Sequence, residues 1–200
     1  PVKSITTGEG GVIATDSEKF CRLLRMFRSH GITRDPHFVE EKNEGPWHQE
    51  MHALGHNYRI TDIQAALGES QLKRLDSFIT KRRTAVRRYP ALLKGIPGLV
   101  LPPQDGAQTK SAWHLYPVQV PPHARKKVFE ALRAAGIGVQ VHYLPVYLHP
   151  FYKKLGYKKG LCPNAEKFYA SEMSIPLFAT ITLAQQKFVA DTLKRILVSL

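Results

Sequence analysis

A long helical pattern in the middle of the chain limits the possible folds more than any other part of the sequence. Thr61 and Gln64 form a capping box, in which the two side chains satisfy backbone N–H groups at the start of a helix. Apolar residues then recur at helical spacing, at Ile63, Leu67, Leu75, Phe78, Ile79, Val86 and Tyr89. Pro90 should kink or end the helix near residue 89, because proline lacks the N–H that the next turn needs. The pattern therefore predicts a connecting helix over residues 61–95, long enough to bridge two domains.

The stretch after this helix has the alternation of strands and helices that is typical of a small α/β domain. Pro97-Gly98 and Pro102-Pro103 mark its boundary. Apolar patterning predicts strands over 113–120, 137–141 and 174–178, and helices over 123–135, 148–155 and 164–172. Thr182 and Gln185 form a second capping box, which should begin a last helix reaching about residue 197.

The stretch before the long helix is less regular. Residues 4–15 suggest a β-hairpin or strand pair around a Gly8-Glu9-Gly10-Gly11 turn. Thr15 and Glu18 match a capping box and should open a helix that stops at Gly31. Residues 33–56 look polar and irregular, and so long a loop in a compact protein is often functional or mobile.

Composition narrows the class of protein. The hydrophobic fraction of 43% and the charged fraction of 22% are ordinary for a globular chain. A formal charge of +13 suggests an anionic partner, such as nucleic acid, a membrane surface or a phosphorylated metabolite. The basic residues are spread over expected helix faces, and none forms the aromatic-interleaved motif of a nucleic-acid module. We therefore expect neither a nucleic-acid partner nor a membrane.

The cysteines and the apolar runs point to a cytoplasmic location. Cys21 and Cys162 match no disulfide framework and no zinc spacing, so we interpret them as thiols of a reducing compartment. No apolar run approaches the roughly 20 residues that a membrane-spanning helix needs.

Lys3 is the strongest candidate for a catalytic residue near the start of the sequence. A lysine followed by a polar, glycine-bearing turn can present its amine to an aldehyde cofactor, because small neighbours allow a close approach. The local pattern alone fits an ordinary solvated lysine equally well. The rest of the chain has to decide between these interpretations.

Six segments in register resemble one family. The sequence resembles the sugar-nucleotide aminotransferases that use pyridoxal phosphate (PLP) on the aspartate-aminotransferase fold, known as fold type I. The residues that carry the resemblance include Lys3-Ser4-Ile5-Thr6-Thr7-Gly8-Glu9-Gly10-Gly11, Phe27-Arg28-Ser29-His30-Gly31, Gly55-His56-Asn57-Tyr58-Arg59, Trp113-His114-Leu115-Tyr116-Pro117, Val141-His142-Tyr143-Leu144-Pro145 and Ser174-Ile175-Pro176-Leu177. The resemblance covers essentially all 200 residues.

The resemblance implies an α/β fold that is the C-terminal portion of such a subunit. Residues 1–60 would be a remnant of the PLP-binding large domain, 61–95 the connecting helix and 96–200 the small α/β domain. Other residues that hold the cofactor in this family would lie upstream of residue 1. We therefore expect this stretch alone to bind PLP weakly or not at all and to be inactive.

The resemblance also implies an activity. Within the family, the chain is most similar to members that transfer an amino group from L-glutamate to the C4 keto group of a UDP-linked 4-keto-6-deoxy-N-acetylhexosamine, in nucleotide-sugar biosynthesis of the pseudaminic acid type. Such enzymes work as homodimers. The alternative is a noncatalytic relative or fragment that binds an anion or a protein partner.

Residue roles follow from the matched segments. Lys3 would form the Schiff base with PLP and then move the proton that transamination requires. Asn57 would reach the cofactor phosphate of the neighbouring subunit with Arg59 beside it, although Asn57 could also be a turn residue and Arg59 could pair with Asp62. Four residues would lie near the sugar nucleotide, with ordinary packing as the alternative for the aromatic ones: His114, Tyr116, His142 and Tyr143.

A metal site is the remaining possibility that the sequence raises. His48, His52 and His56 would align on a helix, and three imidazoles can hold a metal ion. Glu50 is misplaced for either zincin register, and Gly45, Pro46 and Gly55 disfavour a helix there. We therefore expect no metal.

Overall fold

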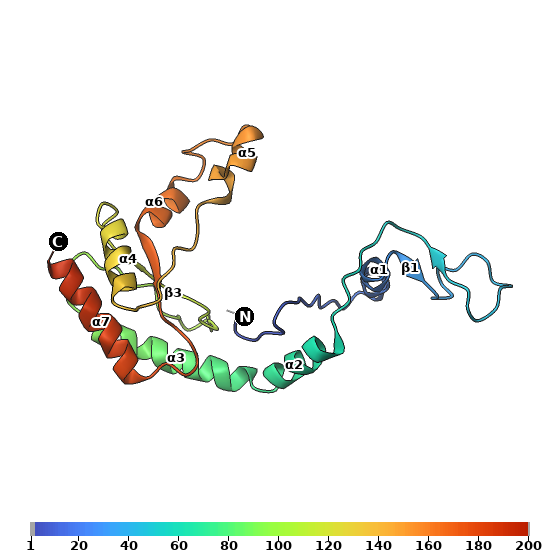
Figure 1. The fold of residues 1–200 in the computed structure, drawn as a ribbon, viewed down its shortest axis with the longest axis horizontal. Helices are drawn as coiled ribbons and strands as arrows, with labels where there is room; N and C mark the ends of the chain where they lie inside the picture. The colour runs from blue at the N-terminus through green and yellow to red at the C-terminus, as the bar shows by residue number, and fades with distance from the viewer. Residues whose placement is uncertain (1–2, 200) are drawn as a thin grey trace. The chain divides into compact units, whose positions relative to one another are not determined.

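The computed structural model describes residues 3–199 and divides the chain into two compact units, Pro1–Lys73 and Arg74–Leu200. The opening residues Pro1 and Val2 lie outside the described residues. The first unit holds α1 (Glu18–Arg28), β1 (Ile32–Thr33), β2 (Glu50–Met51) and α2 (Asp62–Leu72). The second holds α3 (Leu75–Leu92), β3 (Tyr116–Gln119), α4 (Arg125–Ala134), η1 (Val146–Leu148), α5 (Pro150–Lys154), α6 (Pro163–Ser171), β4 (Glu172–Ile175) and α7 (Leu183–Val198) (Figure 1).

Helix α1 begins two residues later than the expected capping box. Ser17 is its N-cap and accepts from the Phe20 N–H at 3.3 Å, whereas the Thr15 hydroxyl accepts from the Ser17 N–H at 3.1 Å. The helix ends at Arg28, and the Gly31 N–H returns to the Met26 carbonyl. Gly31 has φ +71°, and a Cβ there would lie 1.7 Å from the Ala53 carbonyl oxygen. Only glycine therefore fits this helix stop.

The β-hairpin predicted over residues 4–15 does not form. The hydroxyl of Thr6 accepts from the Gly8 N–H and that of Thr7 donates to the Glu9 carbonyl, at 3.0 and 2.8 Å. These local bonds compete with a strand ladder. Residues 33–56 are mostly irregular, as predicted, apart from the short antiparallel pairing of β1 with β2.

The single helix predicted over 61–95 is two helices. The Thr61–Gln64 capping box is present at the start of α2, as predicted. The helix then breaks because Arg74 has φ −107° and ψ 0°, outside the helical range, and α3 begins at Leu75 without a side-chain cap. Pro90 does not end α3, which runs to Leu92: a proline so close to the end removes one hydrogen bond and leaves the preceding turns intact.

The second unit is built around an antiparallel pair, β3 with β4, in the register Tyr116↔Ile175 to Gln119↔Glu172. Helix α7 packs against α3 and α4 beside this pair (Figure 1). Its capping box, Thr182 with Gln185, is present as predicted. The core gathers residues from all these elements, with Tyr89, Val118, Val128, Met173 and Leu193 among those with 0–4% exposure.

The strands of the second unit are shorter than predicted. The strand expected over 137–141 is one isolated bridge, Gln140↔Ser174. The strand expected over 174–178 ends at Ile175, because Pro176 has no N–H for a ladder. Pro150 similarly divides the helix expected over 148–155 into η1 and α5. Among residues 3–199, no helix combines the length and the hydropathy of a membrane-spanning segment.

Candidate functional site

Lys3 is exposed and begins a loop that glycines and threonines shape. Gly8 and Gly10 have φ of +82° and +154°, and a Cβ on Gly10 would lie 2.5 Å from the Thr7 hydroxyl oxygen. The Lys3 side chain makes no hydrogen bond or ion pair with any other described residue. The sequence therefore leaves this amine accessible on a loop that larger side chains could not follow.

The loop after Lys3 is fastened to helix α2. The Gln64 side-chain amide donates to the Glu9 carbonyl at 3.0 Å, while its oxygen accepts from the Thr61 N–H at 3.1 Å. Gly68 lets the helix approach closely, since a Cβ there would lie 2.9 Å from the Thr7 methyl carbon. The capping box that starts α2 thus also positions the segment that carries Lys3.

Asn57 and Arg59 are presented by a backbone that is fixed on the end of α1. His56 accepts from the His30 N–H and donates to the Phe27 carbonyl, both at 2.8 Å, and the Tyr58 N–H donates to the Arg28 carbonyl at 2.9 Å. The side chains of Asn57 and Arg59 are exposed and bond to no other residue among 3–199. In particular, Arg59 does not pair with Asp62.

The donors of the first unit fit the cofactor that the resemblance implies. PLP needs an amine for its aldehyde and strong donors for its phosphate. Lys3 offers the amine, and Asn57 and Arg59 offer an amide and a guanidinium with no other described partner. Their chemistry is compatible with the group, and their roles remain predictions.

The first two residues predicted to face the sugar nucleotide lie in the interior of the second unit. Tyr116 is 0% exposed and packs on the Tyr89 ring at 4.6 Å, and burial raises the pKa of its phenol to about 12. His114 is half-buried, and its carbonyl accepts from the buried Arg82 guanidinium at 3.2 Å. Arg82 also reaches the Leu177 carbonyl at 3.1 Å, so a buried cation holds the segment in place. Substrate contact by either residue remains a prediction.

His142 and Tyr143 are better placed for a ligand. Tyr143 is 68% exposed, and its ring meets the His142 ring edge-on at 4.6 Å. His142 is half-buried, with Nδ1 2.9 Å from the Ser174 hydroxyl oxygen and its backbone N–H 2.8 Å from a Glu172 carboxylate oxygen. Glu172 was not among the residues predicted from the sequence, and Ser174 had no predicted role. Two polar residues at alternate positions of an apolar strand were the available signal.

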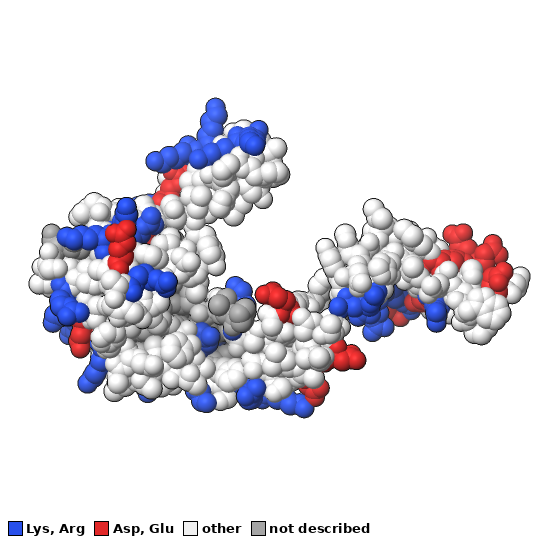
Figure 2. All heavy atoms as spheres, viewed as in Figure 1, with Lys and Arg blue, Asp and Glu red and all other residues white. Residues whose placement is uncertain are grey.

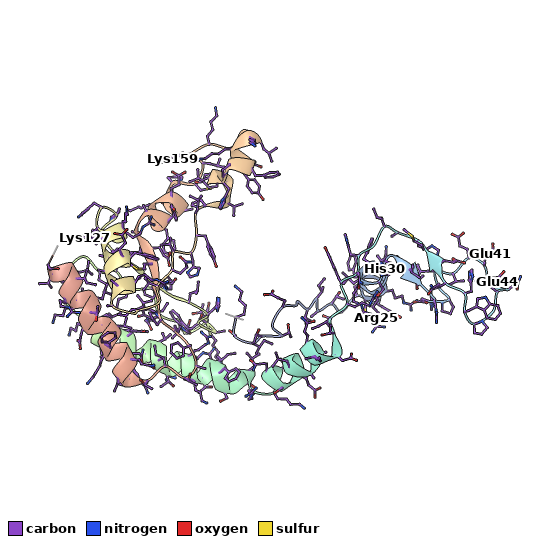
Figure 3. All side chains as sticks on the ribbon, in the orientation of Figure 1. Arg25, His30, Glu41, Glu44, Lys127 and Lys159 are labelled. Atoms are coloured by element: carbon purple, nitrogen blue, oxygen red, sulfur yellow. The ribbon has the colours of Figure 1, made fainter. Side chains whose placement is uncertain are left out.

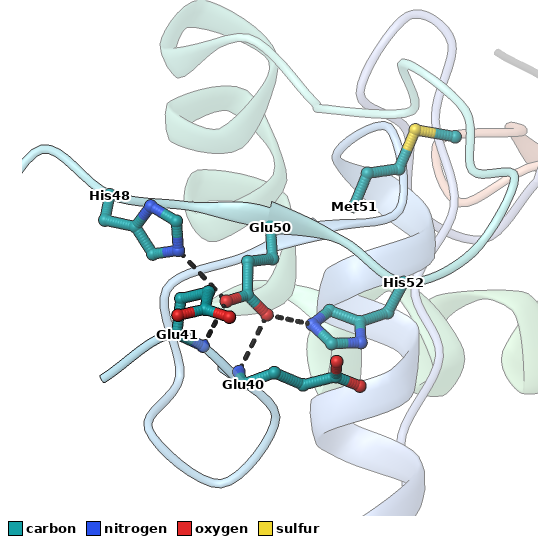
Figure 4. A pocket seen from close by; sticks show the side chains of 6 residues that line it. All are labelled: Glu40, Glu41, His48, Glu50, Met51 and His52. Atoms are coloured by element: carbon teal, nitrogen blue, oxygen red, sulfur yellow. Dashed lines mark hydrogen bonds and ion pairs between the residues drawn. The ribbon is translucent and has the colours of Figure 1, made fainter. Parts of the chain in front are cut away.

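The histidines considered as metal ligands surround a carboxylate instead. Around a hollow of about 380 Å³, Glu50 accepts from His48 at 3.0 Å and from His52 at 2.8 Å (Figure 4). The Glu40 and Glu41 N–H groups also donate to it at 2.8 Å, and these bonds hold the pKa of Glu50 at about 2. His56 instead stacks on Tyr58 at 4.6 Å. Within the described residues, no group of three such side chains could hold a metal ion.

The charges are distributed over both units. On the face drawn in Figure 2, lysines and arginines lie over several elements, with acidic side chains between them. Labelled examples in Figure 3 are Arg25 on α1, Lys127 on α4 and Lys159 after α5. Glu41 and Glu44 lie together on the loop between β1 and β2 (Figure 3). Helix faces carry much of the positive charge, as the sequence indicates.

Comparison with known proteins gives a family match over nearly the whole chain. The sequence model of the DegT/DnrJ/EryC1/StrS aminotransferase family matches residues 1–194. The UDP-4-amino-4,6-dideoxy-N-acetyl-beta-L-altrosamine transaminase of Campylobacter jejuni (serotype O:2) is 40% identical over 201 residues, which is 98% of this chain and 50% of that protein. The chain thus spans about half the length of the curated relatives it matches.

Solved structures give the same result. The aminotransferase PseC of Helicobacter pylori, involved in the biosynthesis of pseudoaminic acid, superposes with a TM-score of 0.87 at 32% identity, covering 98% of this chain and 51% of that one. A putative sugar aminotransferase of Streptococcus pneumoniae in its PLP form has a TM-score of 0.81 at 26% identity, covering 94% and 46%. The fold predicted from sequence, part of a fold type I aminotransferase subunit, is confirmed.

Proposed function

Since the chain belongs to the DegT/DnrJ/EryC1/StrS aminotransferase family, we propose that its protein transfers an amino group from L-glutamate to the C4 keto group of a UDP-linked 4-keto-6-deoxy-N-acetylhexosamine. The observation that carries the proposal is the likeness to the Campylobacter altrosamine transaminase along almost the entire chain. We place the reaction in the cytoplasm, in nucleotide-sugar biosynthesis of the pseudaminic acid type.

Lys3 has the central role in this proposal. Lys3 would hold PLP through its amine, at the aldehyde carbon of the cofactor, and the same amine, once free, would take the proton from the glutamate Cα. When bound, PLP supplies the sink for the electron pair that this proton leaves behind. The exposure of Lys3 supports the role, because the amine must leave one partner and reach another.

Asn57 and Arg59 bind the phosphate in this proposal. The amide N–H and the guanidinium donate to phosphate oxygens, and charge-assisted bonds of this kind are strong. Asn57 serves the neighbouring subunit, so the protein acts as a homodimer. In the second unit, His142 and Tyr143 contact the sugar nucleotide, together with His114 and Tyr116.

A substrate panel tests the activity. The protein as its gene encodes it is incubated with L-glutamate and several UDP-linked 4-keto sugars, and amino-sugar products are followed by mass spectrometry. Lys3→Ala should abolish turnover, whereas Lys19→Ala, on the exposed side of α1, should leave it unchanged. Full turnover by Lys3→Ala would exclude the assigned role. If the protein prefers a different hexulose, the substrate assignment is wrong while the family assignment still holds.

A further inference from the structure

A carboxylate is fully buried on β4. Strand residues two apart share a face, so Glu172 and Ser174 lie on one face while Met173 and Ile175 join the hydrophobic core. Glu172 is nevertheless 0% exposed. Burying a carboxyl group is costly unless it is hydrogen-bonded, so its partners show what it does.

Both oxygens of this carboxylate serve the segment that carries His142. The His142 backbone N–H donates to Glu172 Oε2 at 2.8 Å, and the Ser174 hydroxyl donates to Oε1 at 2.7 Å. Ser174 Oγ lies in turn 2.9 Å from His142 Nδ1. The Gln140↔Ser174 bridge, with N–H to carbonyl bonds of 2.8 and 3.3 Å, holds the two segments together.

The direction of these hydrogen bonds determines which nitrogen of the His142 ring carries the proton. A serine hydroxyl has one hydrogen, and that of Ser174 points to Glu172. Ser174 Oγ can then only accept from the imidazole, so Nδ1 carries the ring hydrogen. In the neutral ring Nε2 is left as an acceptor. Nε2 makes no hydrogen bond with any residue among 3–199.

We propose that Glu172 and Ser174 are positioning residues that hold His142 with its proton on Nδ1, so that Nε2 accepts a hydrogen bond from a hydroxyl or N–H group of the sugar nucleotide. The arrangement favours a donor on the ligand and disfavours a phosphate oxygen, which can only accept. The hydrogen bond from the sugar nucleotide to Nε2 rests on the proposed function, whereas the position of the ring proton on Nδ1 does not depend on it.

The tautomer is measurable in the protein without substrate. Histidines labelled with ¹⁵N distinguish a protonated from a bare ring nitrogen by chemical shift, and His142→Asn assigns the signal by its loss. We expect a protonated Nδ1 and a bare Nε2 in the wild-type protein as its gene encodes it. The opposite tautomer in the wild-type protein would overturn the proposal.

Replacing Glu172 with glutamine should reverse the chain of bonds. In Glu172→Gln, the amide oxygen must face the His142 backbone N–H, which places the NH₂ group against Ser174 Oγ. Ser174 then has to donate to Nδ1, and the ring proton moves to Nε2. Glu130→Gln, which changes an exposed carboxylate on α4, should leave the His142 signal unchanged.

A second variant keeps the test decisive if Glu172→Gln fails to fold. Ser174→Ala removes the acceptor for Nδ1 and should lower the share of the Nδ1-protonated tautomer. An unchanged His142 signal in every folded variant of Glu172 and Ser174 would contradict the positioning role.

Kinetics then test the ligand contact. Glu172→Gln should raise KM for the keto sugar about tenfold, the change expected when one hydrogen bond is lost, with the glutamate half-reaction unaltered. An equal change in both half-reactions, or in neither, would overturn the ligand contact. If the wild-type protein transaminates no sugar at all, the proposed function fails while the tautomer result still stands.

Discussion

The two units present their candidate functional residues by different physical means. Among residues 3–73, Met26 is the one buried hydrophobic residue, whereas the second unit has a continuous core. Lys3, Asn57 and Arg59 are positioned by backbone hydrogen bonds and glycine turns. His142 is positioned by a buried side-chain network on a packed strand. Substitutions of glycines and helix-capping residues should therefore have the largest effects on stability in the first unit, and substitutions of core residues should have the largest effects in the second.

The largest effect should come from the core of the second unit. Leu132 on α4 is 0% exposed, so Leu132→Ala should lower the free energy of unfolding by about 2–5 kcal/mol, through lost transfer energy and the cavity left behind. Leu54 in the first unit is 85% exposed, and Leu54→Ala should cost less than about 0.5 kcal/mol. Urea unfolding of both variants measures the difference, and equal losses would refute the contrast.

A glycine substitution should have the next largest effect, this time in the first unit. Gly31 and Gly95 have φ of +71° and +73°, but a Cβ at Gly95 meets nothing within 4 Å. Each alanine variant therefore carries a strain of about 1–2 kcal/mol. Gly31→Ala should lose roughly 1–3 kcal/mol more, because its Cβ overlaps the Ala53 carbonyl.

Hydrogen exchange measures the loss of stability around Gly31 in the Gly31→Ala variant. The His52 N–H donates to the Gly31 carbonyl at 2.9 Å, so Gly31→Ala should speed its exchange. Gly95→Ala is the matched control, and it should leave His52 exchange as in the wild-type protein. The same exchange rate in both variants would show that the close approach to Ala53 is not what demands glycine.

The two capping boxes offer a smaller and more informative test. Thr61→Ala and Thr182→Ala each remove a threonine cap and should each cost about 1 kcal/mol of stability. Only Thr61 shares its partner Gln64 with the Lys3 loop, through the Glu9 carbonyl. Transamination rates should therefore fall in Thr61→Ala beyond what Thr182→Ala shows. Equal transamination rates in the two variants would show that the Thr61 capping box does not help to position the Lys3 loop.

The smallest effect is a pH dependence of the loop between β1 and β2. The pKa of Glu50 is about 2, below its ordinary 4.5, because backbone N–H groups and two histidines donate to it. A lowered pKa in the folded state means that ionised Glu50 stabilises this loop above about pH 4.5 and that the contribution is lost as pH falls toward 2. The protection of the Glu40 and Glu41 N–H groups, relative to their intrinsic exchange rates at each pH, should fall over that range. In Glu50→Gln this loss of protection should be absent.

The sequence predicted features that depend on local chemistry. The capping boxes at Thr61 and Thr182, the Gly31 stop and the family fold depend on residue types at fixed spacing, and these are present. The capping box predicted at Thr15 and Glu18 was wrong, because Ser17 caps α1 instead. The break at Arg74 carries no proline or glycine, so spacing alone could not reveal it. The hairpin over 4–15 was wrong because threonine side chains took the backbone partners that a ladder needs.

For the candidate site, the matched segments predict roles for Lys3, Asn57 and His142, which stay predictions and whose side chains are exposed or half-buried. They did not separate Tyr143, which is exposed, from Tyr116, which lies in the core, because both fit an aromatic motif. Glu172 was missed because its role depends on a segment thirty residues away in sequence, joined to it by tertiary hydrogen bonds.

The proposed activity requires that the Lys3 amine is the one that binds the cofactor. Borohydride reduction of the protein as its gene encodes it, loaded with PLP, fixes the cofactor to the lysine that holds it, and peptide mass spectrometry identifies that residue. We predict a pyridoxyl group on Lys3 and none on Lys19. A pyridoxyl group on any other lysine, in protein that transaminates, would contradict the account.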